Sequence, residues 1–268
     1  MKRSPFRRAS AGLQIAAAAN DEVDIMLYDE IGPWGVTASE FTRQLSAVKA
    51  KTINLRVNSP GGDVFDGLAI YNALREHPAK VITHIDGVAA SIASVIALAG
   101  DEVRMAENAF LMIHNAWGMV IGYADDMRKE AALLDKVSGS LLMAYESKTE
   151  ATSAEIQGWM DEETWFTADE AQDVGLVDEV IRTESKKALA SIFDLSAYQH
   201  VPAALLEEHE PTTREIERAL RDVGLSQIAA KAFIAAGRAA AEQPEVAEAG
   251  ERDVTPEPVP FVSLNLPI

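Results

Sequence analysis

The chain has 268 residues, 48% of them hydrophobic, and a formal net charge of −18 at pH 7. This length suits one large domain with an appendage or two modest domains, and the apolar content is enough to fill a core. The acidity argues against a nucleic-acid partner, because phosphate contacts need a concentrated basic surface, and the absence of cysteine excludes disulfides, thiolate metal sites and a cysteine nucleophile.

The first 20 residues join a basic start to an alanine-rich run. Their apolar part is short, weakly hydrophobic and interrupted by Gln14, unlike the core of a secretion signal. We therefore expect residues 1–20 to be a basic, flexible arm or a removable propeptide, and the protein to lie in the cytoplasm. The uncharged run 87–100 is shorter than the roughly 20 apolar residues that a membrane span needs, so no membrane partner is expected.

Strand-like and helix-like segments alternate along the next part of the chain. Hydrophobic periodicity predicts strands at 22–32, 52–62 and 80–86, and helices at 37–48, 63–77 and 87–100. The helix at 37–48 has a capping pattern, with Thr37 at its start and Glu40 three residues later. Alternation at this spacing predicts an α/β fold with right-handed crossovers and largely parallel strands.

The pattern continues to residue 182 and then changes. Two short strands are predicted around 106–108, a long helix at 123–149, another helix at 152–160, and a last strand at 176–181. A capping box at Thr167–Glu170 marks one more helix start. We therefore place one catalytic-size domain at 21–185. Residues 186–268 are expected to form a helical extension, with short helices between 211 and 242 and an acidic, proline-rich, disordered tail.

Glycines and small residues mark two turns where chemistry is possible. Gly61 and Gly62 stand between a strand and a helix, where a sharply turned backbone leaves amide hydrogens pointing at a common space. A phosphate cradle is not expected, because no Lys-Ser/Thr ending follows. In the stretch 86–94, Ser91 follows the small residues Gly87, Ala89 and Ala90 near the start of the predicted helix, where a substrate backbone can approach. Ser94, one turn deeper, is expected to be a packed hydroxyl bonded within its own helix.

One of the five histidines follows an apolar strand that is expected to lie beside the Ser91 strand. His114 ends the stretch "FLMIH", and His84, with Asp86 on the same strand face, is the alternative base. Taken singly, each of these features also fits a purely structural role. Together they place backbone donors, a nucleophile and a base at successive strand ends, which is the arrangement that acyl transfer needs.

Four sequence blocks, in order and in register, resemble the Clp-type serine peptidases (the ClpP family) across residues 22–182. The blocks are "NSPGGDVFDGLAIYNAL", "IDGVAASIASVIALAG", "NAFLMIHNAWG" and "WFTADEAQDVGLVDEV". The resemblance implies that Ser91 is the nucleophile, His114 the general base, and the amides of Gly62 and Ile92 the oxyanion hole. It implies no cofactor and no metal.

The family resemblance also implies an architecture and an assembly. The fold is a crotonase-like spiral of ββα units with a projecting handle helix, here 125–148. Family members form homo-oligomeric rings, stacked around a chamber that admits protein substrates. At the third catalytic position the family usually has aspartate, whereas this chain has Glu163, with Asp161 two residues earlier as the alternative acid.

The basic arm and the acidic extension depart from the compact members of the family, whereas the "ETW" variant and the C-terminal segment "ERALRDVGLSQIAAKAFIAAG" resemble the ClpP-related head maturation proteases of tailed phages. That resemblance implies an ATP-independent serine endopeptidase that trims scaffold and capsid proteins, and its own termini, inside the procapsid. Three alternatives stay open: a weak or inactive assembly component, a degradative peptidase with an ATPase partner, and a crotonase-like acyl-CoA enzyme. The last needs a catalytic glutamate in place of the Ser91 and His114 pair and an adenine nucleotide site, and the sequence offers neither.

Overall fold

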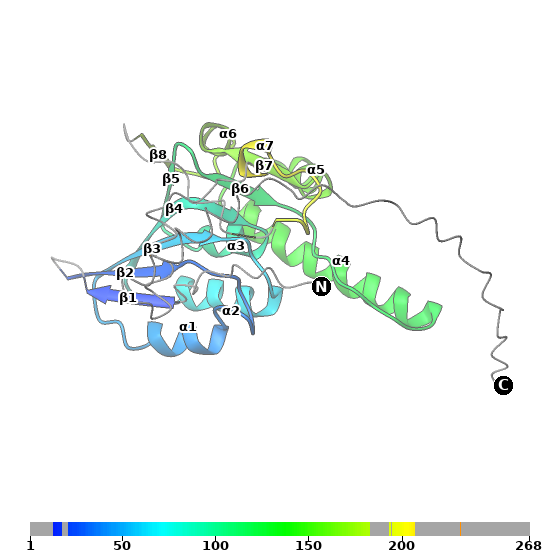
Figure 1. The fold of residues 1–268 in the computed structure, drawn as a ribbon, viewed down its shortest axis with the longest axis horizontal. Coiled ribbons are helices and arrows are strands. Elements are labelled where there is room, and N and C mark those ends of the chain that lie inside the picture. Colours follow the sequence, from blue (N-terminus) through cyan, green and yellow to red (C-terminus); the bar gives the residue numbers. More distant parts are fainter. Residues whose placement is uncertain (1–12, 18–20, 183–192, 194, 207–230, 232–268) are drawn as a thin grey trace, which may run out of the picture. The chain divides into compact units, whose positions relative to one another are not determined.

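The computed structural model describes residues 13–17, 21–182, 193, 195–206 and 231 (Figure 1). Residues 1–210 and 211–268 form two separate compact units, and Lys231 alone is described in the second. The short helices expected between 211 and 242 lie, apart from Lys231, outside the described residues.

An eight-stranded sheet organises the described part of the first unit. Its strands are β1 (Leu13–Ala17), β2 (Glu22–Leu27), β3 (Thr52–Ser59), β4 (Lys80–Ala90), β5 (Glu102–Ala106), β6 (Phe110–Ile113), β7 (Thr164–Thr167) and β8 (Glu179–Ile181). The strand order is β1-β2-β3-β4-β5-β8, while β6 pairs with the end of β4 and β7 pairs with β6. Most pairs are parallel, as predicted, and the pairs β1–β2 and β6–β7 are antiparallel.

Seven helices occur among the described residues. They are α1 (Ala38–Leu45), α2 (Val64–Arg75), α3 (Ile92–Ala97), α4 (Ala124–Glu146), α5 (Ser153–Asp161), α6 (Ala168–Asp173) and α7 (Ala203–Leu206). The expected α/β class is therefore confirmed, and the strand and helix positions follow the sequence pattern closely from β2 up to β4. Strand β7 was not predicted, because its four residues leave too short a pattern to recognise.

Strand β1 lies inside the segment that we expected to be a flexible arm. It pairs with β2 over its whole length, and Leu13 and Ile15 pack against the main core. The alternation Leu-Gln-Ile has the period of a half-buried strand, which the alanine-rich composition around it hides. Residues 13–17 are therefore part of the sheet.

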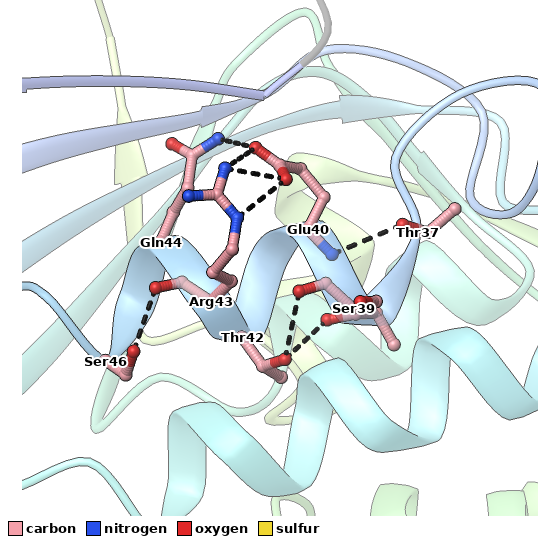
Figure 2. A network of polar contacts seen from close by, with 8 residues as sticks. Thr37, Ser39, Glu40, Thr42, Arg43, Gln44 and Ser46 are labelled. Carbon is pink, nitrogen blue, oxygen red and sulfur yellow. Dashed lines mark hydrogen bonds and ion pairs between the residues drawn. The ribbon is translucent and has the colours of Figure 1, made fainter.

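Helix α1 illustrates how local sequence sets an element's start (Figure 2). The Thr37 hydroxyl accepts a hydrogen bond from the Glu40 amide at 3.3 Å, which satisfies one of the free N–H groups of the first turn. The Glu40 carboxylate turns instead to Arg43, at 2.6 Å, and to Gln44, so the reciprocal half of the predicted capping box is replaced by a surface ion pair. Phe41 and Leu45 face inward and anchor the helix on the core.

Alternating side chains of the central strands form the main core together with one face of α1 and α2. Ile25, Leu55 and Ile85 on neighbouring strands are fully or almost fully buried, and they meet Ile70 and Leu74 of α2 in the same cluster. Burying one aliphatic side chain of this size contributes about 1.5–3 kcal/mol, so these contacts hold the helices in place on the sheet.

The helix predicted at 87–100 begins later than expected. Residues 87–90 continue β4, where Val88, Ala89 and Ala90 pair with Phe110, Leu111 and Met112 of β6. All six residues of α3, from Ile92 onward, are buried. A run that is apolar on every side has no periodicity to separate a buried strand from a buried helix, which explains the shift. As a result Ser91 stands alone at the strand-to-helix junction.

Helix α4 is the long helix that the sequence predicted. Only its C-terminal half is packed: its buried residues begin at Val137, whereas Met127 and Leu133 in the first half are exposed. Figure 1 shows the first half of α4 extending away from the sheet and the other helices. Among the described residues, no helix is both long enough and apolar enough to cross a membrane.

Candidate active site

Ser91 occupies a strained backbone position at the junction of β4 and α3. Its φ and ψ angles are 55° and −131°, a combination that L-residues rarely adopt and that tends to persist where function requires it. The Ser91 amide donates to the Met112 carbonyl at 3.0 Å, which ties the turn to β6. A sharp strand-to-helix turn of this kind aims a serine hydroxyl outward from a sheet, as nucleophile elbows do.

His114 is the histidine that lies against Ser91. The Ser91 Oγ and the His114 Nε2 are 2.7 Å apart, within ordinary hydrogen-bonding distance. The pairing of β4 with β6 brings the two residues together. Ser91 directly follows the carboxyl end of β4, and His114 directly follows the carboxyl end of β6, which runs parallel to it. This is the edge at which sites of parallel sheets gather.

The alternative base, His84, lies within β4, away from this turn. Burial lowers its pKa, and the nearby Arg56 guanidinium adds to the effect. The Asp86 carboxylate, which was weighed as its partner, instead accepts hydrogen bonds from Arg56 and Tyr28, each at 2.5 Å. The His84 and Asp86 pair therefore belongs to a polar network on the sheet face and does not reach Ser91 in the described contacts.

The environment of His114 favours its neutral form. Burial lowers the pKa of the imidazole below its ordinary value, and the Glu163 carboxylate partly opposes this by stabilising the imidazolium. A neutral imidazole whose Nε2 faces a hydroxyl can accept that hydroxyl's proton. At neutral pH the His114 and Ser91 pair is therefore in the protonation state that a general base requires.

The glycine loop before α2 lies directly against the serine. A Cβ added to Gly61 would be 2.7 Å from the Ser91 Cβ, and one added to Gly62 would be 2.0 Å from the Ile31 carbonyl oxygen. Gly61 and Gly62 have φ angles of 92° and 143°, so this close approach needs glycine at both positions. Among the described residues, no acceptor bonds the amide hydrogens of Gly62 or Ile92, which leaves both amides available to a ligand oxygen.

Glu163 and Asp161 occupy different environments. Glu163 is 9% exposed, has a φ of 51° and acts electrostatically on His114, although the described contacts include no hydrogen bond between the two. Asp161 is exposed, and its carboxylate accepts from Asn115 at 2.7 Å and Gln157 at 2.8 Å. These hydrogen bonds lower the pKa of Asp161. Only Glu163 of the two acids is therefore placed to influence the His114 imidazole.

Ser94 is a buried, packed hydroxyl rather than an exposed one. Its Oγ donates to the Ser91 carbonyl oxygen at 2.5 Å and lies 2.8 Å from the Tyr145 hydroxyl of α4. Both side chains are almost completely buried, and burial raises the pKa of Tyr145. The Ser94 and Tyr145 pair therefore supports the strained Ser91 turn from below.

A segment of the C-terminal extension also reaches the site, which the sequence reasoning missed. We call residues 195–202 the strap. The Tyr198 ring lies edge-on to His114, with ring centroids 5.5 Å apart, and edge-on to Trp165 at 5.9 Å. Its hydroxyl donates to the Pro60 carbonyl. Burial raises the pKa of Tyr198 to about 12, and a hydrogen bond with Ser91 opposes that rise.

The strap also holds Glu163. The amides of Gln199 and His200 donate to the Glu163 Oε1 at 2.7 and 2.8 Å. Leu195 at the start of the strap and Leu205 just after it are buried in a second apolar cluster that includes Val88. The signal in the sequence was the set of apolar residues within 193–205. Because the spacing of these residues matches no regular period, it predicted no element.

The described residues contain no cluster of three or more histidine and acidic side chains that could hold a metal ion.

Comparison with known proteins agrees with this geometry. The sequence model of the Clp protease family matches residues 7–184. The chain is 30% identical over 159 residues to the ATP-dependent Clp protease proteolytic subunit 1 of Salinibacter ruber, covering 59% of this chain and 68% of the relative. It is 34% identical over 145 residues to the ATP-dependent Clp protease proteolytic subunit 3 of Rhodococcus jostii, covering 53% of this chain and 72% of the relative. It is 32% identical over 151 residues to the ATP-dependent Clp protease proteolytic subunit of Bacteroides thetaiotaomicron, covering 54% of this chain and 69% of the relative. The α/β sheet with its helices is consistent with the fold of that family, and the chain belongs to the Clp protease family.

Proposed function

We propose that this Clp-family protein is a serine endopeptidase in which Ser91 is the nucleophile and His114 the general base. The observation that carries the proposal is the 2.7 Å contact between the Ser91 Oγ and the His114 Nε2 at a strained strand-to-helix turn. Membership of the Clp protease family supports it, since the relatives named above are proteolytic subunits.

The proposed reaction begins when a peptide carbonyl carbon approaches the Ser91 hydroxyl. The hydroxyl proton passes to the His114 Nε2 as the new C–O bond forms, and the carbonyl oxygen takes negative charge. The amides of Gly62 and Ile92 donate to that oxyanion. The C–N bond then breaks, the proton moves from His114 to the leaving amine, and water releases the acyl group by the same steps in reverse.

Glu163 is the proposed third group. Its charge stabilises the imidazolium that forms during the reaction, which is the electrostatic part of the role of a triad acid. Its backbone is left-handed, with a φ of 51°. Asp161 is excluded from this role in the proposal because its carboxylate is exposed and bonded to Asn115 and Gln157.

The narrower role that we propose is ATP-independent processing of phage scaffold and capsid proteins by a homo-oligomer. It is supported by the resemblance of the extension and the "ETW" variant to phage head maturation proteases. A second role, protein degradation with an ATPase partner, is favoured by the relatives, each of which is a subunit of an ATP-dependent protease. Hydrolysis of folded capsid or scaffold protein by the purified chain alone supports the first role, and hydrolysis that requires an added ATPase supports the second.

The test of the peptidase itself is hydrolysis of an unfolded protein, followed by mass spectrometry of the products. Ser91→Ala is expected to abolish cleavage while the oligomeric state stays that of the native chain. Ser39→Ala, which removes an exposed serine of α1, is the matched control and is expected to cleave at the native rate. Undiminished cleavage by the Ser91→Ala variant overturns the proposal.

A further inference from the structure

We propose that the strap, residues 195–202, is an autoinhibitory segment that occupies the approach to Ser91 in cis and has to leave before a protein substrate can bind. The inference rests on the proposed function, because it concerns access of a substrate to the Ser91 nucleophile. It is carried by three sets of contacts that involve different parts of the strap.

The first contact set places Tyr198 over the reacting groups. Its ring faces the His114 ring edge-on, with the ring centroids 5.5 Å apart, and its hydroxyl donates to the Pro60 carbonyl. Pro60 immediately precedes Gly61, whose backbone abuts the Ser91 side chain. The phenol therefore spans the gap between the glycine loop and the His114 ring, which itself contacts the Ser91 Oγ. A peptide carbonyl has to enter this same gap to reach the Ser91 Oγ and the Gly62 amide.

The second contact set involves the backbone of the strap. The Gln199 and His200 amides both donate to one oxygen, Oε1, of Glu163, and charge-assisted hydrogen bonds of this kind are strong. The Glu163 carboxylate is thus bonded to the strap, and no hydrogen bond joins it to His114 among the described contacts. Release of the strap leaves this carboxylate free to turn toward the imidazole.

The third contact set anchors the strap on the sheet at its first residue and just beyond its last. Leu195 and Leu205 are buried against Val88, Ala90 and Met112, which lie on the β4 and β6 segments that flank Ser91. Apolar burial is non-directional, so the same surface can accept apolar side chains of another extended segment. The strap and a substrate peptide therefore compete for one surface, and activity depends on the fraction of molecules in which the strap is open.

Accessibility of His114 tests the strap without relying on peptidase activity. The full chain is treated with diethyl pyrocarbonate, which carbethoxylates accessible neutral imidazoles, and modification of His114 is followed by mass spectrometry with His77 as the internal reference. If the strap is closed in more than about nine-tenths of molecules, Tyr198→Ala raises the rate at His114 by at least about tenfold. Tyr198→Phe, which keeps the ring and loses one neutral hydrogen bond, raises it by about fivefold or less.

Tyr123→Ala is the control, because it removes an 86% exposed tyrosine next to α4 and is expected to leave the His114 rate unchanged. If the rate of His114 modification is unchanged in both Tyr198 variants, the proposal that the strap covers the site is overturned. A higher His114 rate in the native chain than in the variants overturns it as well.

Peptide hydrolysis then separates the two proposals. Faster hydrolysis by Tyr198→Ala and Tyr198→Phe than by the native chain supports both. Slower hydrolysis by the two variants, with His114 more accessible, overturns autoinhibition and makes Tyr198 a residue that completes the site. If no variant hydrolyses peptide although His114 becomes accessible, the strap covers the site as proposed and the proposed peptidase function fails.

Discussion

Two parts of one site are built differently. One part is the Ser91 and His114 pair, which we call the sheet-built side, and the other is Glu163 with the strap. Ser91 and His114 are held by neighbouring parallel strands, and their 2.7 Å contact follows from the pairing of β4 with β6. Glu163 has a left-handed backbone, and its carboxylate accepts hydrogen bonds from amides that lie more than 30 residues further along the chain. The comparison indicates that the proposed nucleophile and base are positioned by the sheet, whereas the carboxylate of the proposed acid is held by amides of the strap.

The largest expected effect comes from removing the base on the sheet-built side. His114→Ala is expected to lower kcat by about 10⁵-fold or more, because nucleophile and base act as a unit and loss of either removes most of the catalysis. The measurement is hydrolysis of a fluorogenic peptide. His84→Ala is the matched control, and it is expected to retain activity because His84 does not reach Ser91. A large loss in the His84 variant and a small one in the His114 variant would reverse the assignment of the base.

The next largest loss of activity is expected from a substitution in the glycine loop. In Gly62→Ala the new Cβ would collide with the Ile31 carbonyl oxygen at 2.0 Å, so the loop has to shift and the Gly62 amide moves away from the oxyanion position. Loss of one such donor costs about 10²–10³-fold in kcat, with a smaller change in KM. Gly139→Ala, at a position in α4 where nothing lies within 4 Å, is the control. Equal activity of the two variants would contradict an oxyanion role for this loop.

Glu163→Gln is expected to have a smaller effect, with a change in the pH profile. Burial lowers the pKa of His114 and the Glu163 charge raises it, so removal of that charge lowers this pKa further. Since activity requires neutral His114, the acidic limb of kcat/KM shifts to lower pH while the plateau falls by about 10- to 100-fold. Asp161→Asn is expected to change neither the pH of the acidic limb nor the height of the plateau. A shift of the limb to higher pH in Glu163→Gln would contradict the account.

Ser94→Ala is the mildest test of the sheet-built side. The variant loses the hydrogen bond to the Ser91 carbonyl, which supports the strained turn, and leaves the Tyr145 hydroxyl buried without that partner. We expect a stability loss of about 1–3 kcal/mol by chemical denaturation and a several-fold fall in kcat at unchanged KM. Tyr145→Phe removes the deeper partner alone and is expected to change stability more than kcat. A kcat that does not change in Ser94→Ala would show that the turn keeps its geometry unaided.

The sequence predicted the sheet-built side well because its signals are local. Gly62, Ser91 and His114 each follow a strand whose hydrophobic pattern is legible, and parallel pairing then places them at one edge. The start of α3 was missed because residues 87–90 are buried on all sides and carry no periodicity. The strap was missed for another reason: the contacts of Tyr198, Gln199 and His200 join segments far apart in the chain, and no local pattern encodes such contacts.

The comparison also explains why the sequence leaves two candidates for the proposed third group. Glu163 and Asp161 are two residues apart and chemically similar, so spacing alone does not choose between them. Burial and partners separate them in the structure: Glu163 is buried beside the strap, and Asp161 is exposed beside Asn115. Such differences depend on tertiary contacts.

The most direct test of the central claim is covalent labelling of the full chain with a fluorophosphonate, which reacts with serines activated as nucleophiles, followed by mapping of the adduct. The account predicts an adduct on Ser91 alone, lost in Ser91→Ala and His114→Ala and formed faster in Tyr198→Ala. An adduct on another serine, or no adduct even in Tyr198→Ala, would contradict the assignment of Ser91 as the nucleophile.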